Sequence, residues 1–351
     1  MKVQRFILAA CLWTGGLGIA SAQTLELIPN RVLVDESAVI RARGLEPNER
    51  ISIQAELVDG ADEPWSAQAE FIVDAQGAVD TSQQAPVKGS YEGVSAMGLI
   101  WSMKPAAKHV ASYRPPRDLG SQIIKFQLMR NGQQVTSAQM EQRGVAEGVQ
   151  QIKVEGQLHG VLLLPNTKER HPGVLVVGGS EGGMPLGKAA WLASRGYAAL
   201  ALAYFRYDDL PPLLEGIPLE YFGSALAWMM QRPEILPDRI AVVGTSRGGE
   251  LALQLGSMYP QIKAVVAYVP ANVRRAACCG NTRDLKYPHA GHRAGRPEIV
   301  PTWHGNVRNP TSGREENLGG RPQGDAQSSL DAIPKVLEFL RESLLDHNSE
   351  K

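Results

Sequence analysis

Between residues 24 and 145 the chain contains short stretches of β-type residues separated by turn signals. The stretches include RVLVD, AVIRARGL, ISIQAELVD, AEFIVD and IIKFQLMRNGQQVTSAQ. Their separators, such as LEPNE, VDGADEP and DAQGA, are rich in Gly, Pro, Asn and Asp, which favour turns. Because no stretch keeps a 3.6-residue period, we predict an immunoglobulin-like β-sandwich over 24–145, without the Cys–Trp–Cys signature of antibody domains. This half carries no cluster of catalytic residue types, which indicates a structural or substrate-framing domain.

From residue 150 to 351 the pattern changes to alternating strands and helices. IKVEGQLHGVLLLP predicts an opening hairpin, and the later strands are GVLVVGG, YAALALAYF, RIAVVG and IKAVVAYVP. The helices between and after them are GKAAWLASRG, LEYFGSALAWMMQ, GELALQLGSM and LDAIPKVLEFLRESLL. This alternation predicts a mostly parallel sheet with helices on both faces. Binding sites in such sheets form beyond the carboxyl ends of the strands.

The N-terminal residues differ from both halves and resemble an export signal. Lys2 and Arg5 precede the apolar run FILAACLWTGGLGIA, and Ala20-Ser21-Ala22 follows it. A basic start, a short apolar region and a small-residue cleavage site predict a signal peptide over 1–22, removed on export to the periplasm or medium. No other stretch approaches the roughly 20 apolar residues of a membrane-spanning helix. We therefore expect an exported protein without a membrane span.

Composition and cysteine content narrow the candidate partners. The 36 Lys and Arg residues balance the 36 Asp and Glu residues, giving a formal net charge of zero. With no basic stripe, nothing favours nucleic acid or an anionic membrane. Beyond the signal peptide only the neighbours Cys278 and Cys279 remain, and they cannot link distant segments. Because no Cys/His cluster has ligand spacing, we expect no metal and no cofactor, and a small-molecule substrate. These features do not predict an oligomeric state.

The strongest chemical motif is Gly244-Thr245-Ser246-Arg247-Gly248, which lies between a predicted buried strand and a predicted helix. A strand, a sharp turn carrying a serine and then a helix form the nucleophile elbow of α/β-hydrolases. The two glycines let the backbone pass close to neighbouring elements, and the turn exposes the Ser246 hydroxyl to substrate. The sequence therefore predicts an α/β-hydrolase domain with Ser246 as its nucleophile.

A serine nucleophile also requires an oxyanion hole and a general base, and the sequence offers candidates for both. An oxyanion hole takes one N–H from the residue after the nucleophile, here Arg247, and one from the loop after the third strand. The segment GGSEGG, residues 178–183, occupies that loop, and the Ser180 N–H is our candidate, with Gly179 adjacent. The base should be a histidine near the end of the fold, and His292 in YPHAGH holds that place. His289 and His304 are the alternatives.

The chain resembles the bile acid-CoA:amino acid N-acyltransferase and acyl-CoA thioester hydrolase family. The resemblance rests on MGLIWSMKP, GGSEGG, ALAYFRYDDLP, LEYF, TSRGGELAL, YPHAGH and NLGGRP. It implies an N-terminal immunoglobulin-like domain and a C-terminal α/β-hydrolase domain that acts on acyl thioesters. At the matching positions it implies Ser246 as nucleophile and His292 as base. Some relatives have Cys at the nucleophile and transfer the acyl group to an amine, so the serine here favours hydrolysis.

The chain departs from the family pattern between residues 271 and 284. Family members carry a longer segment here, with a strand that ends in the aspartate of the triad. Only ANVRRAACCGNTR precedes Asp284, which is too short for a parallel crossover. The C-terminal domain is therefore predicted to be shortened and to lack the strand that carries the acid.

No other carboxylate is a convincing replacement, so the acid is unknown. Asp284 begins the predicted strand DLKY, which at about 3.3 Å per residue puts it roughly 10 Å below the catalytic edge. Asp208 and Asp209 follow a different strand, and Glu181 would oppose a developing oxyanion. The sequence favours an acyl-CoA thioesterase-like serine hydrolase. The alternatives are an exported carboxylesterase and a catalytically impaired hydrolase-like protein that lacks the triad acid.

Overall fold

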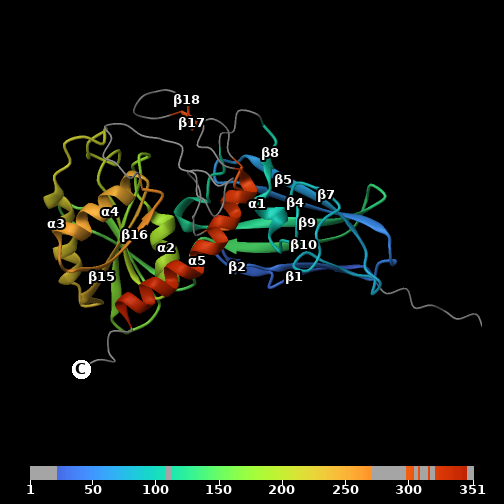
Figure 1. The fold of residues 1–351 in the computed structure, drawn as a ribbon, viewed down its shortest axis with the longest axis horizontal. Coiled ribbons are helices and arrows are strands. Elements are labelled where there is room, and N and C mark those ends of the chain that lie inside the picture. Colours follow the sequence, from blue (N-terminus) through green and yellow to red (C-terminus); the bar gives the residue numbers. More distant parts are fainter. Residues whose placement is uncertain are drawn as a thin grey trace, which may run out of the picture.

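The computed structural model describes residues 22–107, 112–270, 298–303, 307–308, 315–316 and 321–345 of the 351-residue chain. Two units lie side by side (Figure 1). We call residues 24–143 the β domain and the unit that begins at residue 150 the α/β domain. The predicted signal peptide and the segment from 271 to 297 lie outside the described residues, apart from Ala22.

The β domain consists mainly of short strands, as the β-type stretches and the turn signals between them predict. Strands β1, β3 and β6 form a three-stranded sheet, and a seven-stranded sheet has the order β2-β10-β9-β4-β5-β7 with β8 also paired to β5. Their bounds are β1 Thr24–Ile28, β2 Arg31–Leu33, β3 Val39–Arg43, β4 Arg50–Val58, β5 Pro64–Ile72, β6 Val79–Asp80, β7 Lys88–Gly89, β8 Lys104–Pro105, β9 Ser121–Arg130 and β10 Gln133–Arg143. The helix α1 (Gly98–Trp101) and the 3-10 helix η1 (Arg117–Leu119) interrupt this series.

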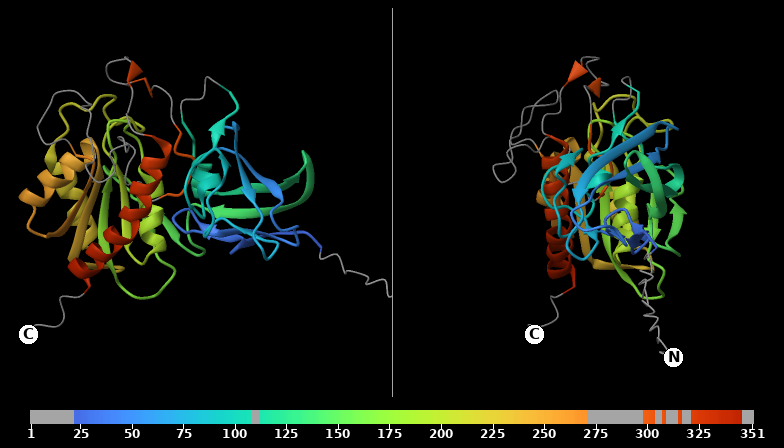
Figure 2. Two further views of the ribbon diagram at one scale, coloured as in Figure 1. Left: turned by 45° about the vertical axis from the view of Figure 1, so that its right-hand side comes forward. Right: turned by 90° about the vertical axis from the view of Figure 1, so that its right-hand side faces the viewer.

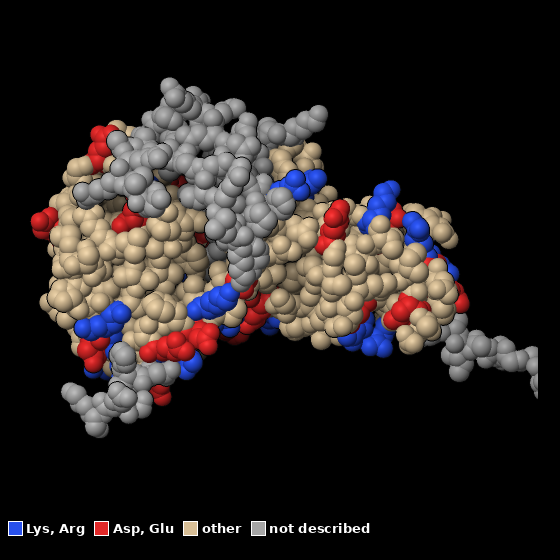
Figure 3. Space-filling model, viewed as in Figure 1, with Lys and Arg blue, Asp and Glu red and all other residues tan. Residues whose placement is uncertain are grey.

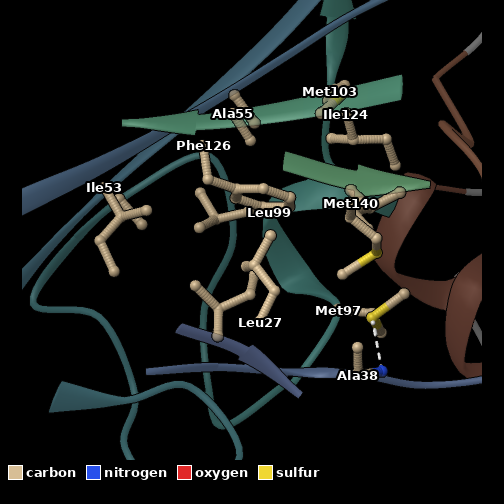
Figure 4. Packing of buried hydrophobic residues seen from close by; sticks show 14 of the residues in the cluster. Leu27, Ala38, Ile53, Ala55, Met97, Leu99, Met103, Ile124, Phe126 and Met140 are labelled. Carbon is tan, nitrogen blue, oxygen red and sulfur yellow. Dashed lines mark hydrogen bonds between the residues drawn. The ribbon is translucent and has the colours of Figure 1, made fainter. Parts of the chain in front are cut away.

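One core lies between the two sheets of the β domain. Figure 4 shows Leu27 of β1, Leu99 of α1 and Phe126 of β9 within it, and the last two are fully buried. Strands β9 and β10 are joined through Asn131 and Gly132, whose φ angles of 51° and 77° suit the tight turn of a two-residue hairpin. The alternation of buried and exposed residues along β4 and β5 keeps one face of the larger sheet on this core.

The α/β domain has a six-stranded sheet of order β11-β12-β14-β13-β15-β16. Strand β12 is antiparallel to both β11 and β14, and the strands from β14 to β16 along the sheet run parallel. The bounds are β11 Gln150–Lys153, β12 His159–Leu164, β13 His171–Val177, α2 Leu186–Ser194, β14 Ala198–Ala203, α3 Leu219–Met230, β15 Ile235–Thr245, α4 Arg247–Met258, β16 Ile262–Tyr268 and α5 Pro322–Leu344. A separate pair, β17 (Val307–Arg308) and β18 (Glu315–Glu316), is antiparallel.

Helices cover both faces of this sheet, which confirms the prediction from the alternating pattern. Successive side chains of a strand point to opposite faces. Leu175 and Val177 of β13 therefore pack with α3 and α4, whereas Val174 and Val176 pack with α2 and α5. All residues of β13 and β14 are buried, as expected of central strands between two helical layers.

An ion pair between the buried Asp35 carboxylate and the partly buried Arg195 guanidinium joins the two domains. The Asp35 carboxylate, 2% exposed, accepts hydrogen bonds from Arg195 Nε and Nη2 at 2.8 and 2.7 Å. The Trp191 indole N–H donates to the same carboxylate at 2.8 Å, and Arg195 also contacts Glu36 at 3.0 Å. A bidentate contact with a third donor gives a defined orientation between α2 and the β domain.

The C-terminal part of the chain also reaches the β domain. The Ile299 N–H donates to the Val34 carbonyl at 2.5 Å, and the side chains of Ile299 and Val300 lie in the β-domain core. Trp303 packs edge-on against Trp65 with ring centroids 6.1 Å apart. Helix α5 then runs along the α/β domain (Figure 2), with Ala326 in the β-domain core and Leu340 against the sheet.

Charged side chains of both signs are interspersed on the face shown in Figure 3. Among the helices in the described ranges, none combines the length and apolarity needed to cross a membrane.

Candidate active site

Ser246 occupies a sharp turn between β15 and α4. Its φ and ψ are 56° and −119°, a conformation that L-residues avoid and that costs on the order of 1–3 kcal/mol. The Ser246 N–H donates to the Tyr268 carbonyl at 2.8 Å, and its own carbonyl accepts the N–H groups of Gly249 and Glu250 at 2.8 and 3.1 Å. These bonds to β16 and to the first turn of α4 hold the strained residue in place. The strand–turn–helix setting predicted for this serine is confirmed.

The two motif glycines are required by backbone contacts on either side of the turn. A Cβ on Gly244 would lie 1.9 Å from the Gly248 carbonyl oxygen. A Cβ on Gly248 would lie 2.1 Å from the Gly178 carbonyl oxygen. No side chain fits at either distance, so the glycines allow α4 to approach both its own strand and the loop after β13. This close approach confirms the predicted reason for the glycines.

The first turn of α4 supplies a positive electrostatic end beside the serine. Ser246 is 7% exposed and immediately precedes the helix, whose N–H groups point toward it. The Arg247 guanidinium is held by Glu250 one turn later, at 2.5 Å. The charge of Arg247 is therefore directed along the helix, and its backbone N–H lies at the helix start, where an oxyanion donor is expected.

The loop at residues 178–183 lies against the nucleophile. A Cβ on Gly179 would be 3.0 Å from the Thr245 carbonyl oxygen and 3.3 Å from Ser246 Cβ. The Gly182 N–H donates to the Gly179 carbonyl at 3.1 Å, which closes a turn around Ser180. The Tyr204 hydroxyl donates to the Gly178 carbonyl at 2.7 Å and ties the loop to the end of β14. The structure thus brings Ser180, Arg247 and Ser246 into one region.

The loop at 178–183 also carries a carboxylate, that of Glu181, which lies close to Gly179. Glu181 Oε2 is 2.8 Å from the position that a Cβ on Gly179 would take. Burial raises the pKa of Tyr204, the negative charge of Glu181 raises it further, and Arg247 opposes the increase. Glu181 therefore adds negative charge beside the predicted oxyanion site, as the sequence suggested.

Asp208 and Asp209 contact a histidine that sequence analysis did not single out. Asp209 Oδ1 lies 3.1 Å from His159 Nε2, and Asp208 Oδ2 lies 3.7 Å from His159 Nδ1. The antiparallel register of β12 pairs His159 with Ala203, which brings the histidine to the loop after β14. The two carboxylates approach opposite ring nitrogens, so they do not converge on one ion. Within the described ranges no group of three or more His, Cys, Asp or Glu side chains could hold a metal.

Lys188 is another neighbour of the elbow that the sequence motifs missed. Its ammonium group contacts the Thr245 hydroxyl and lies 4.1 Å from the centre of the Tyr268 ring. Lys188 lies in the first turn of α2, shortly after the loop at 178–183. This position in the sequence could have indicated that Lys188 lies near the elbow. The predicted base His292, its alternatives His289 and His304, and Asp284 lie outside the described residues.

The elbow, the loop beside it and the two-faced sheet define an α/β-hydrolase domain with a serine nucleophile position. Comparison with known proteins gives the family. Residues 35–156 match the acyl-CoA thioester hydrolase/BAAT N-terminal region, and residues 217–279 match the BAAT/acyl-CoA thioester hydrolase C-terminal region. The chain belongs to this acyl-CoA thioester hydrolase and bile acid-CoA:amino acid N-acyltransferase family.

The mouse and human relatives agree with this assignment. The chain is 30% identical to mouse (Mus musculus) acyl-coenzyme A thioesterase 6 over 306 residues, which covers 82% of this chain and 72% of that protein. It is 36% identical to human (Homo sapiens) bile acid-CoA:amino acid N-acyltransferase over 253 residues, covering 69% of this chain and 60% of that protein. An esterase from Pyrobaculum calidifontis is 23% identical, with a TM-score of 0.31 over 36% of this chain and 46% of the esterase.

Proposed function

We propose that this protein hydrolyses acyl thioesters, in the manner of an acyl-CoA thioesterase, through an acyl-enzyme on Ser246. The observation that carries the proposal is the strained elbow, in which a serine with φ 56° is held between β15 and α4. Strain of this kind persists where the surroundings over-determine it, and it is concentrated at functional sites. The family membership gives the substrate class, because its named relatives include acyl-coenzyme A thioesterases.

In the proposed mechanism His292 takes the proton of the Ser246 hydroxyl as the oxygen attacks the thioester carbonyl carbon. The tetrahedral oxyanion accepts hydrogen bonds from the backbone N–H groups of Ser180 and Arg247. Collapse of this intermediate breaks the carbon–sulfur bond, and the sulfur leaves with the proton held by His292. Water then attacks the acyl-enzyme with His292 again as base, which releases the carboxylic acid and restores Ser246.

A thioester lessens the demand on the residue that assists the leaving group. A thiol has a pKa near 8.5, so the sulfur leaves readily and needs only a weak proton donor, here the protonated His292. An amide would need a strong proton donor at the same step. This difference favours thioester or activated ester chemistry in a site for which no triad acid is assigned. In the absence of an acid, the imidazole loses orientation, an effect of order 10⁴ in turnover in a serine protease.

Asp208, Asp209 and Glu181 do not supply that acid in this proposal. Asp208 and Asp209 are engaged with His159, and Glu181 lies over the loop that would bind the oxyanion. The proposed mechanism therefore uses Ser246 as nucleophile and His292 as base, and it assigns no residue as the acid.

A second candidate substrate class follows from the predicted signal peptide. Export places the protein away from the cytosol, where coenzyme A esters occur, so an ordinary carboxylic ester would be the available substrate. The third candidate is an exported hydrolase-like protein without turnover, which the short segment between 271 and 284 favours. The three candidates share the fold and differ in what happens at Ser246.

Steady-state kinetics with two substrates separate these candidates. The protein and its Ser246→Ala, His292→Asn and His289→Asn variants are assayed with an acyl-CoA and a p-nitrophenyl ester. Loss of Ser246 or His292 should lower kcat by a factor on the order of 10⁴ or more, and His289→Asn should have little effect. Ser257→Ala is the matched control, because Ser257 is an exposed serine later in the same helix.

The outcomes have distinct meanings. Preference for the acyl-CoA supports the thioesterase, and preference for the p-nitrophenyl ester supports the carboxylesterase. Reaction with a fluorophosphonate, followed by mass spectrometry, should label Ser246 in either case. If the folded protein turns over neither substrate and is not labelled, the enzymatic proposal is wrong and the non-catalytic candidate stands.

A further inference from the structure

A cavity of about 250 Å³ lies between the two domains. Its walls come from the turn around Pro116–Gly120 and from Val34 on the β-domain side, and from Met184 and Leu186 on the α/β side. Val300, in the segment that returns to the β domain, completes the wall. A cavity of about 150 Å³ accommodates benzene, and drug-sized pockets begin near 300 Å³. The space therefore suits a small molecule slightly larger than benzene.

Buried polar side chains form one wall of this cavity. The Tyr113 hydroxyl donates to Gln122 Oε1 at 2.7 Å, and Gln122 Nε2 donates to Gln142 Oε1 at 2.7 Å. Gln142 Nε2 then donates to the Ile299 carbonyl at 2.9 Å. The exposed fractions of Tyr113, Gln122 and Gln142 are only 7%, 6% and 1%. This chain of hydrogen bonds orients polar groups along a cavity that is otherwise largely apolar, as in small-molecule sites.

The charges on the described lining residues all have the same sign. Glu298 and Asp118 are carboxylates, and the described lining contains no Lys, Arg or His. Glu298 is partly buried, whereas Asp118 is exposed. The charge of Glu298 acts on two neighbouring phenols. Burial raises the pKa of both Tyr113 and Tyr268, and the negative charge of Glu298 raises each further. A partly enclosed negative charge of this kind attracts a cation that can displace water.

The backbone of the turn that lines the cavity is strained. Asp118 and Leu119 have φ angles of 52° and 58°, in the left-handed region that non-glycine residues rarely adopt. For a leucine this conformation is a genuine outlier, and such outliers concentrate at ligand clamps and switch regions. The turn places Leu119 in the lining of the cavity, where it also packs against the core of the α/β domain.

We propose that this interdomain cavity binds a small organic cation with a compact apolar body, such as an arylalkyl ammonium. Glu298 would pair with the ammonium group, and Leu119, Leu186 and Val300 would contact the apolar body. The described lining of this cavity includes neither Ser246 nor the loop at 178–183, and the proposal does not depend on the proposed hydrolase activity. The cavity is formed by both domains, so its ligand stabilises their docked arrangement.

Isothermal titration calorimetry with three ligands of similar size tests the proposal. Benzylammonium carries a positive charge, benzyl alcohol is a neutral analogue, and benzoate is an anion. The full chain and its Glu298→Gln, Leu186→Trp and Glu338→Gln variants are titrated at low ionic strength. Glu338→Gln is the charge-matched control, because Glu338 is exposed on α5 and does not line the cavity.

We expect benzylammonium to bind at least tenfold more tightly than benzyl alcohol, and benzoate not to bind. Glu298→Gln should weaken benzylammonium binding at least tenfold while changing benzyl alcohol binding by less than twofold. Leu186→Trp, which fills the space, should abolish binding of both, with circular dichroism confirming that the variant is folded. Glu338→Gln should bind all three ligands as the unmodified protein does.

Three results would overturn the proposal. They are equal affinity for benzylammonium and benzyl alcohol, unchanged benzylammonium binding in Glu298→Gln, and absence of benzylammonium binding to the unmodified chain. If Leu186→Trp does not fold, Val300→Phe serves as the second cavity-filling variant and must give the same loss.

Discussion

Replacement of Gly248 by alanine tests whether the contact between α4 and the loop at 178–183 is as tight as the structure shows. In an ordinary helix a glycine-to-alanine change gains up to about 1 kcal/mol of stability. Here the new Cβ would lie 2.1 Å from the Gly178 carbonyl oxygen and 2.8 Å from the Val177 carbonyl oxygen. Both contacts are with backbone, so neither can be relieved by turning a side chain.

The size of the effect follows from this distance. Bringing the Cβ to about 3.0 Å from the carbonyl oxygen, starting from 2.1 Å, requires a shift of about 0.9 Å between α4 and the loop. Overpacking of this kind costs about 1–3 kcal/mol, against a helix gain of up to about 1 kcal/mol. We therefore expect a net loss of roughly 1–2 kcal/mol. A displacement of about 1 Å in catalytic geometry lowers turnover about 100-fold, so kcat should fall by that factor.

Urea denaturation and p-nitrophenyl ester kinetics measure both effects. Gly178→Ala is the control for stability, because a Cβ on Gly178 meets no atom within 4 Å. Its free energy of unfolding should change by less than about 0.5 kcal/mol. If Gly248→Ala stabilises the protein, the helix gain exceeds the clash and the inferred close approach is wrong. If it destabilises the protein while kcat is unchanged, the loop does not position the oxyanion donors.

Three further changes probe other contacts. Arg195→Met leaves the buried Asp35 carboxylate without its charged partner and should lower the free energy of unfolding, measured in urea, by about 3 kcal/mol. Lys335→Met breaks an exposed ion pair and should lower it by about 0.5 kcal/mol or less. Burial alone would raise the pKa of Asp80, but hydrogen bonds from Ser82 and Arg41 outweigh it and lower that pKa below 3.8. The charged Asp80 carboxylate therefore stabilises the fold above pH 3.8, and this stabilisation is lost as the pH falls through the pKa of the folded state. Asp80→Asn should thus be destabilising at pH 7 and nearly neutral at the lowest pH at which the fold persists. Tyr204→Phe removes one hydrogen bond to the loop at 178–183 and should cost about 1 kcal/mol in thermal unfolding and about tenfold in kcat/KM.

The elements predicted best are those determined by local sequence. The elbow at Ser246 is a contiguous strand–turn–helix motif, and Gly244 is needed for a contact within that motif. Residues 173–177 of β13 and all of β14 (Ala198–Ala203) are continuous apolar runs, which is the pattern of central parallel strands. Both types of feature are visible in a window of a few residues.

Features that depend on distant contacts were predicted less completely. Helix α5 begins at Pro322, eight residues before the predicted LDAIPKVLEFLRESLL. Its first turns bury polar residues, namely Asp325, Ser328 and Ser329. Buried polar residues do not contribute to a hydrophobic period, so the pattern misses them. The contact between His159 and Asp209 depends on strand register across a sheet and has no local signal. The assignments of His292 and of the missing acid strand stay predictions, since both concern residues outside the described ranges.

The return of residues 299–303 to the β domain affects the order in which the protein can be built. Chains emerge from the ribosome N-terminal end first, and domains generally fold in that order. Here the core of the β domain includes Ile299, Val300 and Ala326, which are synthesised after all six strands of the α/β sheet. The β domain therefore completes its core only after the sheet of the α/β domain, β11 to β16, has been made. A chain that stops short of residue 299 leaves an unfilled site in its first domain, which gives a quality-control protease a means of recognising it.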